Sequence, residues 1–307
     1  MTAAPTRDDI AAAHARIAPH IHRTPVMDAA VAGLPLSFKF ENMQVTGSFK
    51  ARGAFNTLLS SQVPAAGVVA ASGGNHGAAV AHAAVTLGHP AQIFVPEYAG
   101  PAKIGLIRAT GAGLTVVPGT YQEAADAAKA HEAATGAMQV HPYDAAMTLA
   151  GQGSLFREWD EQGLEADTVL IAVGGGGLIG GALAWWQGRR KVVAVEPVLA
   201  PTLHEALVHG PDHEVAVGGI AANALGAKRI GRMVLDLARA AGVAAVLVED
   251  EAIAASQRLL WDRFRQYVEP AGATALAALT AGAYVPAPGE RVAVLVCGAN
   301  PAPGPFG

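Results

Sequence analysis

Short runs of aliphatic and β-branched residues alternate with alanine-rich segments along most of this chain, and that alternation limits the folds open to it. The pattern is typical of βαβ units, in which helices cover both faces of a mostly parallel sheet. Several of the short runs are apolar throughout, as parallel strands buried on both faces are. The sequence therefore predicts an α/β fold, with strands over residues 36–41, 67–71, 91–95, 114–117, 138–140, 168–173, 192–195, 245–248 and 292–296.

Helix signals lie between these strands. Thr6 and Asp9 have the spacing of a capping box at the start of a helix. The segments 75–87 and 121–135 are each followed by a glycine, the residue type that commonly ends a helix in the left-handed conformation. At roughly 150 residues per domain, a chain of 307 residues should form about two domains.

Charge and cysteine content exclude several classes of function. With 21 Lys+Arg against 25 Asp+Glu, the net charge of -4 offers no basic excess for a nucleic acid. The one cysteine, Cys297, excludes an internal disulfide and a multi-thiolate metal site and favours a reducing cytoplasm. Charged residues at 7–9 interrupt any secretion signal, and glycines interrupt the apolar stretch 168–187. We therefore expect neither a nucleic-acid nor a membrane partner.

The segment TGSFKARG, residues 46–53, follows a predicted strand and contains Lys50. Ser48 stands where it could cap a helix with Lys50 in its first turn. Of the lysines in the chain, only Lys50 lies in an apolar, glycine-flanked turn, where loss of hydration would lower the pKa of the amine and make it a nucleophile. An ordinary solvated lysine is the alternative, because charged residues are mostly exposed.

Two glycine-rich loops connect predicted strands to predicted helices. The first, SGGNHG, begins at Ser72, and its free backbone N–H groups would bind an anion. It could equally be a tight turn in which Asn75 caps the helix and His76 is exposed. The second contains four consecutive glycines, 174–177, whose backbone can approach an anion closely.

The second loop also has the spacing of a dinucleotide-binding fingerprint. Gly175, Gly177 and Gly180 form G-x-G-x-x-G after a strand, and the acidic Glu196 follows about 20 residues later. This arrangement predicts an NAD-dependent dehydrogenase. It leaves Lys50 and the SGGNHG loop without a role, so both interpretations stay open at this point.

Five motifs taken in order carry a family resemblance: TGSFKARG, SGGNHG, VGGGGLIGG, EPAGATALAA and CGAN. The chain resembles the serine/threonine dehydratase family of pyridoxal-phosphate enzymes, in the catabolic type without a regulatory domain. The resemblance extends from residue 24 to residue 300 and implies the two-domain, tryptophan synthase β-like fold (fold type II). It implies a homodimer whose large domain comprises residues 1–66 and 143–307, with a small mobile domain, residues 67–142, carrying the asparagine loop.

The resemblance also implies a role for each motif. Lys50 would be the catalytic residue, binding pyridoxal phosphate through its amine and removing the Cα proton of the substrate. The implied reaction is β-elimination from L-threonine, L-serine or a related 3-hydroxy amino acid, giving a 2-oxo acid and ammonia. A neutral Cys297 thiol at the ring nitrogen would favour elimination. The implied cofactor contacts are Phe49, Lys50, Asn75, Gly174, Gly175, Gly176, Gly177, Leu178 and Cys297, and the substrate pocket is Ser72, Gly73, Gly74, Asn75 and His76.

Departures from the family pattern bear on the chemistry. Gly73 stands where racemising relatives carry a serine base, which disfavours racemisation. A racemase-type enzyme, a β-replacement enzyme and a non-catalytic module that binds the cofactor remain as alternatives. Glu196 and Ala200 match a cation site of the relatives, but Thr202 replaces its aspartate, so no metal is predicted. Glu269, which precedes the Pro270 turn, is expected either to have a structural role or to support a residue that contacts the ligand.

Overall fold

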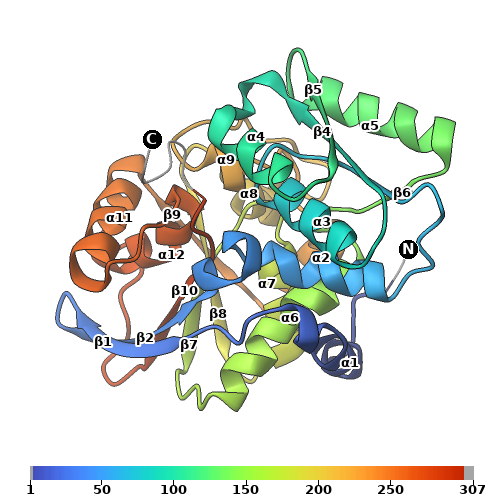
Figure 1. Ribbon diagram of the computed structural model, residues 1–307. Coiled ribbons are helices and arrows are strands. Elements are labelled where there is room, and N and C mark those ends of the chain that lie inside the picture. Colours follow the sequence, from blue (N-terminus) through green and yellow to red (C-terminus); the bar gives the residue numbers. More distant parts are fainter. Residues whose placement is uncertain (1–2, 301–307) are drawn as a thin grey trace.

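The computed structural model describes residues 3–300, and its strands form two sheets (Figure 1). The larger sheet has the strand order β1-β2-β10-β7-β8-β9. Only β1 pairs antiparallel to its neighbour, and the other pairings are parallel. Its strands are β1 (Val26–Val31), β2 (Leu34–Phe40), β7 (Thr168–Ala172), β8 (Lys191–Pro197), β9 (Ala244–Val248) and β10 (Val292–Val296).

The smaller sheet is entirely parallel and has the order β5-β4-β3-β6. Residues 68–139 supply all four strands, so the sheet lies inside the segment 67–142 that the sequence assigns to a small domain. Its strands are β3 (Val68–Ala71), β4 (Ala91–Pro96), β5 (Gly113–Val117) and β6 (Met138–Gln139).

Helices pack around both sheets (Figure 1). Within residues 3–300, none is long and apolar enough to cross a bilayer. They are α1 (Arg7–Ile17), α2 (Lys50–Leu59), α3 (Asn75–Thr86), α4 (Pro101–Arg108), α5 (Tyr121–Thr135), α6 (Ala146–Glu161), α7 (Gly177–Trp186), α8 (Thr202–His209), α9 (Ala222–Leu225), α10 (Arg232–Ala240), α11 (Asp250–Phe264) and α12 (Pro270–Thr280).

The main core lies on the larger sheet, where β7, β10 and most of β8 are buried along their length. Helix α12 packs against β7, β8, β9 and β10, and α7 packs against β7 and β8. A second core lies on the smaller sheet and includes residues of α2, among them Ala51, Phe55 and Leu58. Helix α2 also packs against α6, so it contacts the structure built on both sheets.

This topology gathers the sequence motifs at one edge of each sheet. Lys50 follows β2, the tetraglycine loop follows β7, and Cys297 follows β10; these three strands run parallel in one sheet. The SGGNHG loop follows β3 of the smaller sheet. The carboxyl ends of parallel strands are where α/β proteins bind ligands.

The nine predicted strands all form, with ends shifted by up to two residues. The structure confirms the Thr6 capping box, and the helices expected to begin at 75 and 121 end within one residue of their predicted ends. Strand β1 was not predicted: it forms a hairpin with β2 through Ala32 and Gly33, both at positive φ. Alanine rarely adopts that conformation, so the hairpin lacks the usual turn signal.

The capping role proposed for Ser48 is wrong. Helix α2 begins at Lys50 with Phe49 at its N-cap, and no side chain caps it. Ser48 is instead extended and forms a β-bridge with Gly298, next to the end of β10. The pairing of these two segments, which are distant in the sequence, outweighs the local capping preference.

Candidate active site

The segment before Lys50 is held against the segment that contains Cys297. The Phe49 N–H donates to the Cys297 carbonyl at 3.3 Å, and the Ala299 N–H donates to the Gly47 carbonyl at 2.8 Å. These backbone bonds join residues about 250 positions apart in the chain. They bring the TGSFKARG and CGAN motifs side by side.

The Lys50 amine lies in low-polarity surroundings at the start of α2. Its Nζ donates to the Pro142 carbonyl at 2.7 Å and lies 5.2 Å from the centre of the Phe49 ring. Loss of hydration lowers the pKa of Lys50 to about 8, although the Glu269 carboxylate opposes the shift. Roughly a tenth of the amine is therefore neutral at pH 7, a condition that favours nucleophilic attack and proton removal.

The sequence singled out Lys50, but two other lysines are also buried in the structure. Lys39 is fully buried and Lys103 is 6% exposed, and burial lowers the pKa of both. Neither lies in a glycine-flanked turn; Lys39 is in β2 and Lys103 in α4. Burial that depends on tertiary packing leaves no mark on the flanking residues.

The tetraglycine loop presents free donors at the start of α7. Within residues 3–300, no acceptor takes the N–H groups of Gly174, Gly175, Gly176, Gly177 or Leu178, although all but Gly175 are buried. Buried donors without partners are rare and point to a missing acceptor. Together with the helix N-terminus they fit a phosphate group.

The glycines are also required by packing. Gly176 has a φ of +88°, and a Cβ atom at Gly177 would lie 2.9 Å from the Tyr143 Cα. A Cβ atom at Gly174 would lie 2.8 Å from the Leu225 Cα. Larger residues would displace the neighbouring chain, so the loop can hold this shape only with glycine.

The SGGNHG loop connects β3 to α3 and places Asn75 as the first residue of that helix. The Ser72 hydroxyl accepts from the Gly74 N–H at 3.2 Å, which stabilises the turn. The Asn75 Nδ2 donates to the Glu269 carboxylate, and its Oδ1 accepts from Asn300 Nδ2 at 2.7 Å. Asn75 follows β3 of the smaller sheet, and Glu269 precedes α12, which packs on the larger sheet. Their hydrogen bond therefore links the structure around the two sheets.

His76 is buried rather than exposed. Its Nε2 lies 2.9 Å from the Val140 carbonyl, which can only accept, so this nitrogen carries the proton. Burial, together with the nearby charge of Lys50, lowers the pKa of His76 to about 3. The ring is therefore neutral and its Nε2 is already engaged within the protein.

Cys297 stays protonated at physiological pH. It is buried, its Sγ lies 3.3 Å from the Ala271 carbonyl, and burial raises the pKa of the thiol well above its usual range. An uncharged thiol beside Lys50 leaves the amine without a strong anionic partner in this position.

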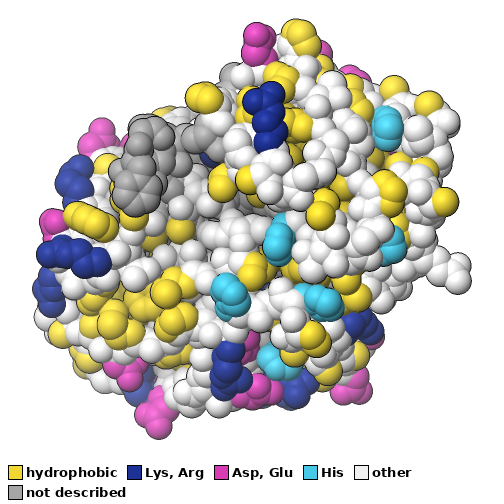
Figure 2. All heavy atoms as spheres, viewed as in Figure 1, with side chains coloured by type: hydrophobic (Ala, Val, Ile, Leu, Met, Phe, Trp, Pro, Cys, Tyr) yellow, Lys and Arg dark blue, Asp and Glu magenta, His cyan; other side chains and the backbone are white. Residues whose placement is uncertain are grey.

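A cavity of about 260 Å³ lies between Lys103 of α4 and residues from the segment 220–300. In the space-filling view, the face shown in Figure 2 is hollowed near its centre, and Lys and Arg side chains are scattered over it. Both an ammonium, Lys103, and a carboxylate, Glu269, line the cavity. The remaining lining residues are Ile220, Ala221, Asn223, Ala224, Gln257, Tyr267, Pro270, Ala271 and Asn300.

Glu196 is engaged within the larger sheet. Its carboxylate accepts from the N–H groups of Leu203 and His204 at 2.6 and 2.8 Å, at the start of α8, and is fully buried. This arrangement leaves it unable to contact the ribose of a dinucleotide without breaking those bonds. The Thr202 hydroxyl, which stands in place of an aspartate, donates to the Ala227 carbonyl at 2.8 Å.

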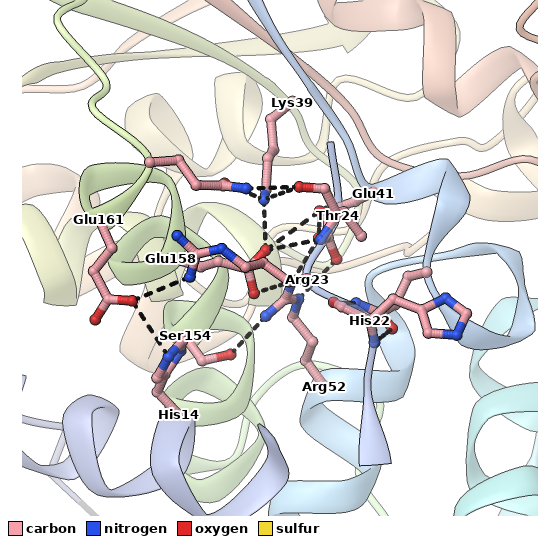
Figure 3. A network of polar contacts seen from close by, with 12 residues as sticks. His14, His22, Arg23, Thr24, Lys39, Glu41, Arg52, Ser154, Glu158 and Glu161 are labelled. Carbon is pink, nitrogen blue, oxygen red and sulfur yellow. Dashed lines mark hydrogen bonds and ion pairs between the residues drawn. The ribbon is translucent and has the colours of Figure 1, made fainter. Parts of the chain in front are cut away.

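A network of buried charges supports the helix that carries Lys50 (Figure 3). Arg52, two residues after Lys50, is fully buried, and its Nη2 lies 2.7 Å from Glu41 and 3.0 Å from Glu158. Lys39 contacts the same Glu158 at 2.5 Å. Figure 3 shows these side chains converging from β2, α2 and α6. The sequence does not reveal this network, because Glu158, which joins Lys39 and Arg52, lies more than 100 residues away from both.

Taken together, these residues fit pyridoxal phosphate. The unpartnered amides at the start of α7 match its phosphate, and the lysine amine matches its aldehyde. The uncharged thiol of Cys297 can accommodate a ring nitrogen without a charge partner. The fit rests on the donors and acceptors of this chain, and the dinucleotide alternative has no comparable set because Glu196 is engaged.

Comparison with known proteins gives the same answer. Phenylserine dehydratase from Ralstonia pickettii is 36% identical over 97% of this chain and 94% of its own length. L-threonine ammonia-lyase from Geobacter sulfurreducens is 36% identical over 86% of this chain and 67% of its own length. The structure of maize serine racemase matches with a TM-score of 0.90 and 32% identity, covering 97% of this chain and 94% of that one. The family model described as pyridoxal-phosphate dependent enzyme matches residues 17–298, and the chain belongs to this family.

Proposed function

We propose that this protein is a dehydratase that eliminates the β-hydroxyl group from L-3-hydroxy amino acids and releases a 2-oxo acid and ammonia. L-Threonine and L-serine are the first candidates, and bulkier homologues belong to the same class. One observation carries the proposal: the Lys50 amine has a pKa of about 8 and lies in a site that offers no charged partner for a ring nitrogen.

The cofactor contacts follow from the free groups of the site. The N–H groups of Gly174 to Leu178 would hold the phosphate, Asn75 the ring hydroxyl, and Cys297 the ring nitrogen. Phe49, which directly precedes Lys50, would pack against the ring. When bound, pyridoxal phosphate makes the Cα–H bond of an attached amino acid acidic enough to break.

Lys50 supplies the base in this scheme. Its amine removes the Cα proton and holds it on Nζ, a role supported by the lowered pKa. The Pro142 carbonyl, which accepts from Nζ at 2.7 Å, fixes the direction of the amine. The uncharged Cys297 thiol would not keep a proton on the ring nitrogen, which would favour loss of the β-hydroxyl once Lys50 has taken the Cα proton.

Gly73 supports elimination over racemisation. A Cβ atom at this position would overlap the Cβ of Ala99 and lie 2.8 Å from Cγ1 of Val95. The site therefore has no hydroxyl base here and no free space for one. Racemisation needs a second proton carrier on the other side of Cα, and this position does not provide it.

The lining of the cavity supports a substrate class broader than serine. Ala221, Ala224 and Tyr267 offer apolar surface, and the volume of about 260 Å³ exceeds what a methyl side chain needs. The Ralstonia relative is a phenylserine dehydratase and the Geobacter relative acts on L-threonine. We therefore include threonine, serine and 3-phenylserine among the candidate substrates.

The test is a product assay on the protein loaded with pyridoxal phosphate. L-Threonine, L-serine and 3-phenylserine are offered separately, and 2-oxo acid, ammonia and the D-enantiomer are quantified, with Lys50→Ala as the control. Stoichiometric 2-oxo acid and ammonia that depend on Lys50 support the dehydratase. Accumulation of the D-enantiomer in excess of 2-oxo acid would identify a racemase instead. A β-replacement enzyme would form product only when a second nucleophile is added.

The larger organisation is also part of the proposal. We propose that residues 67–142 form a small domain that moves against residues 1–66 and 143–307, and that the chain works as a homodimer in the cytoplasm. The separate parallel sheet of the smaller segment supports the small domain, and the single buried, unpaired cysteine supports the cytoplasmic location. Sedimentation of the loaded protein tests the dimer, and small-angle scattering with and without substrate tests the motion.

A further inference from the structure

We propose that Glu269 is a positioning residue that fixes the Asn75 amide so that it donates a hydrogen bond to the ring oxygen of the cofactor. The proposal rests on the cofactor-binding part of the proposed function and specifies a residue for which the sequence left a structural and a supporting role open. It is carried by a hydrogen-bond chain whose direction can be worked out from its ends.

The first end of the chain is a backbone carbonyl. Asn300 Nδ2 lies 2.7 Å from the Thr46 carbonyl, which can only accept, so this atom must be the amide nitrogen. The same Nδ2 lies 2.7 Å from the side chain of Asn75 and donates its second hydrogen there. Both hydrogens of Asn300 are thus used, and the Asn75 atom that receives one of them is Oδ1.

The second end of the chain is the Glu269 carboxylate. Because Oδ1 of Asn75 faces Asn300, Nδ2 of Asn75 faces Glu269 and donates to its Oε1. An amide nitrogen carries two hydrogens, so one N–H of Asn75 remains for a ligand. Within the described residues it has no other acceptor. Two anchors on opposite ends of the amide set the direction in which that N–H points.

The surroundings of Glu269 hold the acceptor in a buried position. Glu269 is 3% exposed, and burial raises the pKa of its carboxyl to about 7, while Lys103, Asn75 and Lys50 oppose the shift. Lys103 lies in the same cavity wall and has no ion pair or hydrogen bond within residues 3–300. Its charge is therefore available to stabilise the carboxylate across the cavity.

The backbone also makes room for this contact. A Cβ atom at Gly298 would overlap the Glu269 carboxylate and lie 3.4 Å from Asn75 Nδ2. The Glu269 N–H donates to the Gly298 carbonyl at 3.3 Å, which holds the residue against the segment that contains Cys297. Glu269 therefore connects the Asn75 helix, the Lys103 helix and the Cys297 segment at one point.

Two matched substitutions separate positioning from charge. Glu269→Gln keeps the length of the side chain and an oxygen that accepts from Asn75, but removes the charge. Glu269→Asp keeps the charge but is one methylene too short to reach Asn75. Positioning predicts that Gln resembles the wild type and that Asp resembles Glu269→Ala.

The experiment measures cofactor binding and absorption without substrate, so it does not depend on which reaction the enzyme performs. Apo-protein of each variant is titrated with pyridoxal phosphate, and the absorption band of the lysine-bound cofactor is recorded. We expect Glu269→Ala and Glu269→Asp to weaken binding on the order of tenfold, the effect of losing a buried hydrogen bond and the order it imposes on Asn75. Their spectra should shift toward the form whose ring oxygen is protonated, and Glu269→Gln should stay within about twofold of the wild type.

The outcomes are distinct. If the wild type binds no cofactor, the proposed function fails, whatever the variants do. If the wild type binds and Glu269→Asp is normal while Glu269→Gln is impaired, the charge matters and the positioning role is overturned. Equal spectra and affinities for all four proteins would overturn it as well. A folding defect in Glu269→Ala leaves the Gln and Asp comparison intact, because those two side chains nearly preserve the packing.

Discussion

Two groups of buried charges lie close together in this molecule, and they differ in how completely they are paired. Behind the Lys50 helix, Arg52 contacts both Glu41 and Glu158, and Lys39 contacts Glu158. At the start of that helix, the Lys50 amine has only a carbonyl acceptor, and Lys103, which lines the cavity, has no ion pair among the described residues. The first group is saturated, whereas the second has unused capacity.

The acid and base strengths reflect the same difference. Burial alone would raise the pKa of Glu158, but Arg52 and Lys39 outweigh it and hold the pKa below its usual value. For Glu269 and Lys50, burial dominates and brings the pKa of Glu269 to about 7 and that of Lys50 to about 8. Paired charges stabilise one conformation, and incompletely paired ones are left to act on a ligand.

The strongest way to break this comparison is to remove Arg52. Arg52→Ala leaves Glu41 and Glu158 buried without their shared partner, which should lower the free energy of unfolding by about 3–5 kcal/mol. Urea denaturation measures this loss. Arg157→Ala is the matched control, because its pair with Glu161 is partly exposed and should contribute less than about 1 kcal/mol. Similar losses for the two variants would show that the network does not behave as a buried unit.

The lowered pKa of Lys50 predicts how cofactor capture depends on pH. The pKa of Lys50 is lowered to about 8 from an ordinary value of 10.5, so the neutral amine appears at lower pH than in a solvated lysine. The rate at which apo-protein captures pyridoxal phosphate should therefore rise with pH and level off above a midpoint near 8. Stopped-flow absorbance between pH 6 and pH 10 measures it. A rate still rising steeply at pH 10 would contradict the lowered pKa.

The smallest expected effect is at Gly73, where the SGGNHG loop packs tightly against Ala99 and Val95. Gly73→Ser should lower the free energy of unfolding by about 1–3 kcal/mol, because the new Cβ overlaps Ala99 and crowds Val95. Combining it with Ala99→Gly removes part of the overlap and should recover part of the loss. Thermal denaturation of the single and double variants measures both. Equal stability of Gly73→Ser and the wild type would show that Ala99 and Val95 can shift to accommodate the new side chain without loss of stability.

The sequence predicted the fold and the motif positions well, for a physical reason. Buried parallel strands are continuous apolar runs, and the glycine loops after β3 and β7 are local in the chain. Strand β1 was missed because its hairpin turns at Ala32, a residue type that rarely adopts positive φ. A sequence pattern reports only on residues that are neighbours in the chain. The buried strands and the glycine loops have such local patterns, and the β1–β2 hairpin does not.

The candidate site could be predicted only in part. Lys50, Asn75, the tetraglycine loop and Cys297 lie in motifs, and tertiary pairing brings their segments together. The Arg52 network and the roles of Glu269 and Lys103 depend on contacts across more than 100 residues of chain. No local signal distinguishes these charged residues from exposed ones. The burial that sets their chemistry is a property of the folded molecule.

The central claim is that the incompletely paired group of charges around Lys50 binds pyridoxal phosphate through the Lys50 amine. Protein mixed with the cofactor is reduced with borohydride, which fixes any lysine linkage, and the modified peptides are identified by mass spectrometry. The account predicts modification of Lys50 alone, at up to one equivalent, with Lys39 protected by its pairing. Predominant modification of Lys103, the buried lysine that lines the cavity, would contradict the account. So would the absence of any stable modification.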